Sequence, residues 1–464
     1  MKLKLTVTAC FLLFYLGFSC DIRNDTSKTQ NNTPTPTPTP TIEVKSLCPE
    51  ETRPFPSYDV GFAPSEEWCK NNPDKKVFRL SQDYKTASKT TGEELPWKKF
   101  AAKTDDLKTN WKDYLFAALS YAFEGNIEKD WIVQENAKRK WFHAPWMHAT
   151  KNGREFLRGL TKERGSCEKE LILGGVCEGN EPRPIENWAV SVYNEPGGYY
   201  FAKVWQEMYN AGLDASKPNP NPKPKNFGDE GFPEGTVAVK LLFTAGNLPY
   251  LKNSPTWDAD IKRGKEPPQK MRLLQIDIAI KDKISPTGWV FGTFIHHDDA
   301  PEMKYPDALA EDKKNWLRMV PVGMMFGNDV GEFPALKEPF ETYLNDTIPV
   351  PQHYGCEKRL NGPVDNARSS CISCHALAEV AQDFTKIRFK EKTGCTTEED
   401  IKFWFKNINP ASKNAIDRTF SQSTPGRKIF SLDYSLQLSE GIKRCCDSSV
   451  CQCKIEEVSR DGVF

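Results

Sequence analysis

The sequence has no excess of charge of either sign, because 63 Lys and Arg residues are balanced by 63 Asp and Glu residues. A protein that binds nucleic acid normally carries a basic excess, so we expect no nucleic-acid partner. Four motifs are also missing: the phosphate-binding G-x-x-x-x-G-K-[ST] loop, the G-x-S-x-G turn, H-E-x-x-H and the dinucleotide glycine fingerprint. Nothing in the sequence therefore indicates a nucleotide-dependent enzyme, a serine hydrolase or a zinc protease of those types.

No hydrophobic run long enough to span a membrane follows the N-terminus, and the N-terminal run is itself short. A positive start, Met1 to Lys4, precedes a mostly apolar stretch from Leu5 to Phe18. This arrangement is typical of a signal peptide rather than of a membrane-spanning helix. The run ends in Leu16-Gly-Phe-Ser-Cys20, which resembles a bacterial lipobox, although its Leu lies one position further upstream than is usual. We predict export and a lipid on Cys20; the alternative is an ordinary cleaved signal with an incidental Cys20.

The segment after this signal is polar and contains the alternating stretch Thr33–Pro40. Alternating proline removes backbone donors and favours an extended conformation, so residues 21–44 are predicted to be a disordered, semi-rigid spacer. The folded region is predicted at 45–464, with a sheet-containing part at about 45–350 and a helical part at about 351–464. A signal at 1–20 followed by such a spacer predicts a lipid-anchored protein of the bacterial envelope that faces the periplasm, on either the inner or the outer membrane.

The spacing of apolar residues predicts helices before and after a central sheet. Helical periodicity is found at Trp111–Phe123, Tyr199–Leu213, Ala376–Phe384, Glu398–Asn407 and Leu432–Arg444. Runs rich in β-branched and aromatic residues are found at Thr236–Thr244, Met271–Ile280 and Trp289–Ile295. In the middle run, apolar residues alternate at Leu274, Ile276, Ile278 and Ile280. The predicted class is α+β with a mostly antiparallel sheet.

Fourteen cysteines are many for a cytosolic protein of this length, whereas export explains them. Two of them, Cys371 and Cys374, belong to the motif discussed next, and Cys10 and Cys20 lie in the signal. The other ten are Cys48, Cys69, Cys167, Cys177, Cys356, Cys395, Cys445, Cys446, Cys451 and Cys453. We predict disulfides among these ten, with Cys167 and Cys177 closing a compact loop; metal binding by the C-terminal group is the alternative.

The motif that carries chemistry is Cys371-Ile-Ser-Cys374-His375, which matches the C-x-x-C-H signature of covalent haem attachment. On one helical turn, positions i and i+3 lie on the same side, so both thiols can reach two vinyl groups at one porphyrin edge. His375 lies on that side too and can ligate the iron. We therefore predict one covalent haem c on Cys371 and Cys374, with His375 as its proximal iron ligand. The alternatives are a local disulfide and a zinc site.

The stretch around this motif, Asn361–Val380, resembles the c-type cytochromes. Further stretches resemble a group of uncharacterised bacterial cytochrome-c-like envelope proteins, namely His143–Trp146, Asn152–Glu155, Asn187–Val190, Gly288–Thr293 and Val320–Asp329. This wider resemblance implies no known activity. The chain departs from the small soluble cytochromes c, in which the motif lies near the start of a domain of about 100 residues and the distal methionine follows it. Here neither Met nor His follows His375.

A sixth iron ligand must therefore come from upstream, from an unusual residue, or be absent. Met324 and Met325 are our first candidates, because Gly323 and Gly327 flank them and allow the backbone to approach a flat cofactor closely. In an extended strand adjacent side chains point to opposite faces, so only one of the two can ligate, and we favour Met325. The alternative is that both are core residues. His353 is a weaker candidate.

These observations predict a lipid-anchored monohaem c-type cytochrome that transfers single electrons to or from a redox partner protein in the envelope. The main rival is a haem enzyme or ligand sensor with an open sixth site, acting on peroxide or a small gas. It is motivated by the long folded region before the motif, because a domain of about 100 residues suffices for a small carrier. A third possibility is a structural envelope protein stabilised by haem.

Overall fold

The computed structural model describes residues 64, 66–147, 154–177, 181–205, 231–330, 339–348, 354–381, 397–405, 407 and 429–447. The chain divides into the units Met1–Val44 and Lys45–Phe464, and every described residue belongs to the second unit. The predicted signal, the lipidation site Cys20, the proline-rich spacer and the candidate ligand His353 lie outside the described residues.

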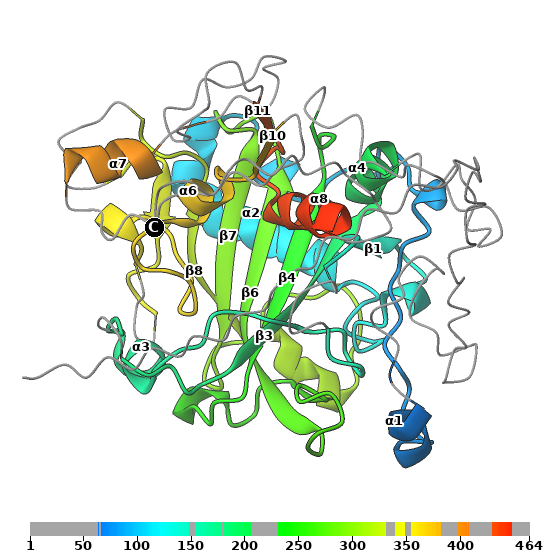
Figure 1. Ribbon diagram of the computed structural model, residues 1–464. Coiled ribbons are helices and arrows are strands. Elements are labelled where there is room, and N and C mark those ends of the chain that lie inside the picture. The colour runs from blue at the N-terminus through cyan, green and yellow to red at the C-terminus, as the bar shows by residue number, and fades with distance from the viewer. Residues whose placement is uncertain are drawn as a thin grey trace, which may run out of the picture. The chain divides into compact units, whose positions relative to one another are not determined.

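A nine-stranded antiparallel sheet forms the centre of the described region (Figure 1). Its strands follow the order β1–β3–β4–β6–β7–β8–β9, while β2 pairs with β3 and β5 pairs with β6. Their bounds are Trp141–His143 (β1), Thr161–Lys162 (β2), Asn187–Asn194 (β3), Val237–Thr244 (β4), Thr256–Ala259 (β5), Gln269–Lys281 (β6), Trp289–His296 (β7), Met319–Met325 (β8) and Thr342–Leu344 (β9). The three predicted strands correspond to β4, β6 and β7, and the α+β class with a large antiparallel sheet is confirmed.

The described α-helices range in length from the 5 residues of α6 to the 20 residues of α2. The α-helices are Glu66–Asn71 (α1), Thr104–Phe123 (α2), Glu168–Leu173 (α3), Glu195–Val204 (α4), Cys371–His375 (α6), Glu398–Trp404 (α7) and Leu436–Asp447 (α8). Short 3₁₀ turns are Tyr84–Thr86, Lys98–Phe100, Val133–Glu135, Pro249–Leu251, Glu311–Leu317 and Cys356–Lys358. None of the described helices is long and apolar enough to cross a membrane.

Most sequence-predicted helices are present with shifted ends. Helix α2 contains the predicted 111–123 segment, α4 starts four residues before the predicted 199 and its expected end lies outside the described residues, and α7 and α8 match the last two predictions. The prediction at 376–384 is wrong where the structure describes it. Glu379–Ala381 form strand β10, which pairs with Ile429–Ser431 (β11) in a separate two-stranded sheet. Pairing with a distant segment overrides the local helical periodicity.

The two faces of the large sheet are covered by different helices (Figure 1). The long helix α2 packs on one face, where its side chains form a core with residues such as Val239 and Ile278. Helices α4, α6 and α8 pack on the other face, in a second core that contains Trp289 and Phe291 of β7. Alternation of side chains along each strand separates these two cores, so each strand supplies one row of residues to each face.

A β-bulge in β6 makes one detail of the predicted alternation wrong, namely the placement of Leu274 on the same face as Ile276. The pairing of β4 with β6 shifts register between Leu242 and Phe243, where Gln275 and Leu273 are the respective partners. Ile276, Ile278 and Ile280 therefore share one face as predicted and pack with α2, together with Leu273, whereas Leu274 packs in a separate small core. An inserted residue reverses the orientation of the side chains that precede it, which a simple alternation count does not anticipate.

Candidate functional site

Cys371, Cys374 and His375 lie on the single turn of helix α6. The turn starts at Ser370, whose side chain accepts a hydrogen bond from the backbone N–H of Ser373, as an N-cap residue does. Ile372 and Ser373 are buried, whereas the two thiols and the imidazole are only partly buried. The i, i+3, i+4 spacing thus presents the three reactive groups on one side and packs the intervening residues on the other.

These three groups line one cavity of about 410 Å³ on the α8 side of the sheet. Its walls include the aromatic side chains of Tyr193, Trp289 and Phe291, with further residues from α8 and from the loop before α6. Pockets that hold cofactors and small ligands are typically mostly apolar and about 300–1,000 Å³, so this cavity falls within that range. Figure 1 shows α6 and α8 on the same side of the large sheet.

The imidazole of His375 is held in one tautomer. Its Nδ1 lies 2.7 Å from the carbonyl oxygen of Tyr434, and a carbonyl can only accept, so Nδ1 carries the proton. Burial lowers the pKa of His375 to about 4, against the hydrogen bond to Tyr434, so the ring is neutral. The other nitrogen, Nε2, is then a lone-pair donor. Metal-ligating histidines usually donate their second ring N–H to a carbonyl or carboxylate in this way, and the ring of Phe291 packs 4.8 Å away.

The two thiols of the motif differ from the other described cysteines. Cys167 and Cys177 form the predicted disulfide, and Cys69, Cys356, Cys445 and Cys446 are also disulfide-bonded. Among the described cysteines, Cys371 and Cys374 alone are free. Burial, followed by the charges of Asp365 and Asp277, raises the pKa of Cys371 well above its usual range, and burial and Asp365 raise that of Cys374 to about 11. Both are therefore protonated thiols at neutral pH.

A row of polar side chains crosses the sheet along the floor of this cavity. Ser191 of β3 pairs with Lys240 of β4, Lys240 with Asp277 of β6, and Asp277 with Thr293 of β7. All four residues line the cavity, as does Asp365 from the loop before α6. The sequence analysis did not single out this row. The sequence near this row offers one indication of it. Lys240 and Asp277 are charged residues within otherwise apolar strands, and each alternates with apolar residues that face the other side of the sheet.

The candidate distal methionines occupy opposite faces of β8, as expected for neighbours in a strand. Met324 packs with α2, and Met325 packs in the core that contains Ile372 of α6. Among the described residues that line the cavity the only methionine is Met147, which the sequence analysis did not propose. Met147 follows β1 and is partly buried, and its carbonyl oxygen accepts a hydrogen bond of 2.6 Å from Arg444 of α8.

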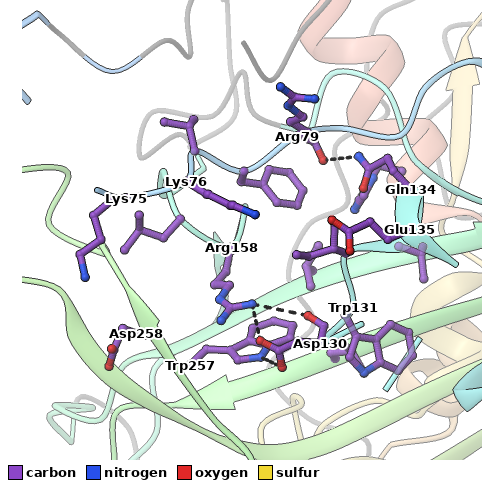
Figure 2. Close-up of a pocket in the computed structure, with 18 of the residues that line it drawn as sticks. Lys75, Lys76, Arg79, Asp130, Trp131, Gln134, Glu135, Arg158, Trp257 and Asp258 are labelled. Atoms are coloured by element: carbon purple, nitrogen blue, oxygen red, sulfur yellow. Dashed lines mark hydrogen bonds and ion pairs between the residues drawn. The ribbon is translucent and has the colours of Figure 1, made fainter. Parts of the chain in front are cut away.

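The other potential sites within the described residues lack this combination of groups. The one cluster of potential metal ligands found there is Cys167, Glu170 and Cys177, and its two sulfurs are joined to each other. A second cavity, of about 620 Å³, includes no cysteine among its described lining residues. Figure 2 shows Arg158 in this cavity beside Asp130, with 2.7 Å between the charged groups, above the indole of Trp257. It has no group that can attach a cofactor through sulfur.

Comparison of the chain with protein-family models, with curated proteins and with solved structures finds no match. Any conclusion about function therefore depends on the chemistry of the site itself.

Proposed function

We propose that this protein is a monohaem c-type cytochrome that transfers single electrons in the bacterial envelope. The observation that carries the proposal is the joint presentation of two free thiols and a neutral, oriented imidazole to one cavity by the single turn of α6. In the C-x-x-C-H arrangement the thiols hold the porphyrin through thioether bonds and the imidazole ligates the iron.

The geometry disfavours both alternative interpretations of the motif. A local disulfide would join Cys371 to Cys374, yet these are the free cysteines in the described part of the chain, while the other described cysteines are paired. A structural zinc site needs four ligands, usually Cys or His. The motif supplies three, and no cluster of potential metal ligands among the described residues includes them. Haem attachment uses all three motif residues and needs no fourth Cys or His for its two thioether bonds.

Other parts of the chain orient the imidazole of His375 and form the walls of the cavity. The carbonyl of Tyr434 fixes the ring of His375, which keeps its Nε2 directed away from that carbonyl. The aromatic side chains of Tyr193, Trp289 and Phe291 add apolar surface to the walls of the cavity. When bound, haem supplies a one-electron couple, and a ligand set that stays fixed keeps the reorganisation on electron transfer small. We propose Met147 as the distal ligand, with Met325 as the second candidate.

The proposed location in the cell depends on the sequence of the N-terminal segment alone. Cys20 is proposed as the lipidated N-terminus and residues 21–44 as a spacer from the membrane to the folded region. The electron donor and acceptor are then redox proteins of the same compartment. An open sixth position is the rival outcome: an iron that binds carbon monoxide rapidly in the resting protein would favour a haem enzyme or gas sensor.

The test is covalent attachment of haem to the exported protein. The denatured wild-type chain is expected to retain haem and to exceed the mass of the apo-chain by one haem. The double variant Cys371→Ser, Cys374→Ser should lose this adduct. The matched control is Cys167→Ser, Cys177→Ser, which also removes two sulfurs but leaves the motif intact, and it should keep the haem. Complete extraction of haem from the wild type by acid and acetone would refute the proposal.

A further inference from the structure

Asp277 of the polar row and Asp365 of the loop before α6 share one hydrogen-bond donor, the side-chain amide of Gln275. Nε2 of Gln275 lies 2.8 and 2.9 Å from the two carboxylate oxygens of Asp277 and 3.3 Å from Oδ2 of Asp365. The backbone N–H of Gly362 also donates to Oδ2 of Asp365, at 3.0 Å. Two carboxyl groups this close do not both ionise easily, because each charge disfavours the other.

Asp277 is also connected to the haem-attachment motif. The hydroxyl of Thr293 lies 2.9 Å from Oδ1 of Asp277 and 4.0 Å from Sγ of Cys371. Asp277 and Asp365 are only partly buried, and both line the cavity that α6 faces. A haem attached through Cys371 would occupy the cavity that this carboxyl pair lines, and a change in its charge would act on the pair through a medium of low dielectric constant.

The cation nearest to this pair is already engaged. Lys240 lies directly opposite Asp277 in the sheet, but its Nζ forms a 3.0 Å ion pair with Glu163. Burial lowers the pKa of Lys240, yet Glu163, Asp365 and Asp277 together raise it above its usual range, so this lysine stays protonated. One cation thus faces three carboxyl groups, so the cluster has an excess of negative charge when all three are ionised. Protonation of one carboxyl group reduces this excess.

Further charged or titratable groups line the cavity, among them Lys162 of β2, Tyr193 of β3 and Tyr434. Nζ of Lys162 lies 2.9 Å from Glu186, with which it pairs, and burial raises the pKa of Tyr193 to about 12. Helix α6 supplies Cys371, Cys374 and His375, and helix α8 supplies Glu440 and Arg444. In the proposed haem protein both thiols become thioethers and the imidazole is ligated, so none of these three titrates. Glu440 lies 3.7 Å from Arg444, with which it pairs. Of these groups, Asp277 is the one whose pKa burial and the charge of Asp365 raise toward neutral pH.

We infer that Asp277 and Asp365 form a proton-binding site that is linked to the redox state of the haem, an inference that rests on the proposed function. When a donor redox protein supplies one electron and the iron passes from Fe(III) to Fe(II), one positive charge beside the pair is lost. The pair then takes up one proton from water, which protonates one carboxylate oxygen. Oxidation releases the electron to an acceptor and the proton to water, so that electrons and protons balance one to one.

The protonation state of the isolated chain agrees with this inference. Burial, and next the charge of Asp365, raise the pKa of Asp277 to about 7, although Lys240 and the hydrogen bonds from Gln275 and Thr293 oppose the shift. A positive ferric iron would stabilise the ionised carboxylate and lower this pKa, and reduction would remove that effect.

The test is a redox titration of the haem-loaded protein at several pH values between about 5 and about 9, a range that spans the values expected for such a carboxyl pair. The midpoint potential should fall as pH rises, with a limiting slope of about 59 mV for each tenfold drop in proton concentration, the value for one proton per electron. Asp277→Asn should flatten this slope strongly. The matched control is Asp258→Asn, which removes an exposed carboxylate on β5, outside the haem-facing cavity, and it should keep the wild-type slope.

Two results would overturn the inference, and a third would refute the proposed function on which it rests. A wild-type potential that does not change with pH would refute the inference directly, and so would a slope that persists in the double variant Asp277→Asn, Asp365→Asn, because the proton would then reside elsewhere. In either case the haem is present and the proposed function stands. A chain that carries no covalent haem refutes the proposed function instead and removes the basis of the inference.

Discussion

The segment that orients His375 is anchored by the buried carboxylate of Asp433, next to Tyr434. Nζ of Lys281 lies 2.6 and 2.8 Å from the two oxygens of Asp433. The indole N–H of Trp289 and the backbone N–H of Phe232 also donate to this carboxylate, at 2.9 and 2.7 Å. The side chains of Lys281 and Asp433 are only 10% and 3% exposed. Asp433 thus connects two strands of the large sheet to the peptide that carries the carbonyl partner of His375.

Asp433→Asn should therefore destabilise the fold strongly. Asn keeps the size of the side chain and tolerates the positive φ of 49° at this position, so the change removes mainly the negative charge. Removing one partner of a buried ion pair leaves the other charge uncompensated and costs about 3–5 kcal/mol. Urea-induced unfolding followed by tryptophan fluorescence measures this loss. In the haem-loaded protein we also expect a broadened haem spectrum, because the support of Tyr434 loosens.

The control for this prediction also removes the positive charge of Lys281, which Asp433→Asn leaves without a partner. The double variant Lys281→Met, Asp433→Asn should be more stable than Asp433→Asn alone, because no buried cation is left without a partner. The exposed substitution Asp258→Asn should change the free energy of unfolding by no more than about 0.5 kcal/mol. If Asp433→Asn also stays within that limit, the ion pair does not anchor the segment and the reasoning is wrong.

Three further predictions concern the iron ligands and the membrane. Met147→Leu should abolish the weak near-infrared band of a methionine-ligated ferric haem, lower the reduction potential and open the iron to carbon monoxide, whereas Met325→Leu should leave all three unchanged; the reverse result would identify Met325 as the ligand. In the haem-free chain, the pKa of His375 is about 4, below the value of about 6.5 for an exposed histidine. The unfolded state therefore binds more protons than the folded state in this pH range. As the pH is lowered from about 6.5 to about 4, the free energy of unfolding should fall, and it should fall less steeply in His375→Gln than in the wild type. Cys20→Ala, if still exported, should move the protein from the membrane to the soluble fraction, and an unlipidated N-terminus in the wild type would contradict the predicted anchor.

Local sequence determines much of the framework. The strands β4, β6 and β7 are found where runs of β-branched and aromatic residues predict them, and α2 where apolar residues recur at helical spacing. The spacing of Cys371, Cys374 and His375 likewise predicts that they share one side of a helical turn, and they do so on α6. Each of these features depends on residues within a few positions of one another, so the sequence alone predicts it.

Tertiary structure alone determines how these pieces meet. The pairing register of four strands aligns Ser191, Lys240, Asp277 and Thr293 into one row that lines the cavity. The fold also brings Tyr434 to the imidazole of His375 and Met147 to the same cavity. The helix predicted at 376–384 is replaced by β10 for the same reason, since its partner β11 lies far along the chain. The sequence alone determined which groups can do chemistry and which lie on a common turn. Contacts between residues distant in sequence determined which groups face one another, because strand register and helix packing depend on the whole core and not on any local pattern.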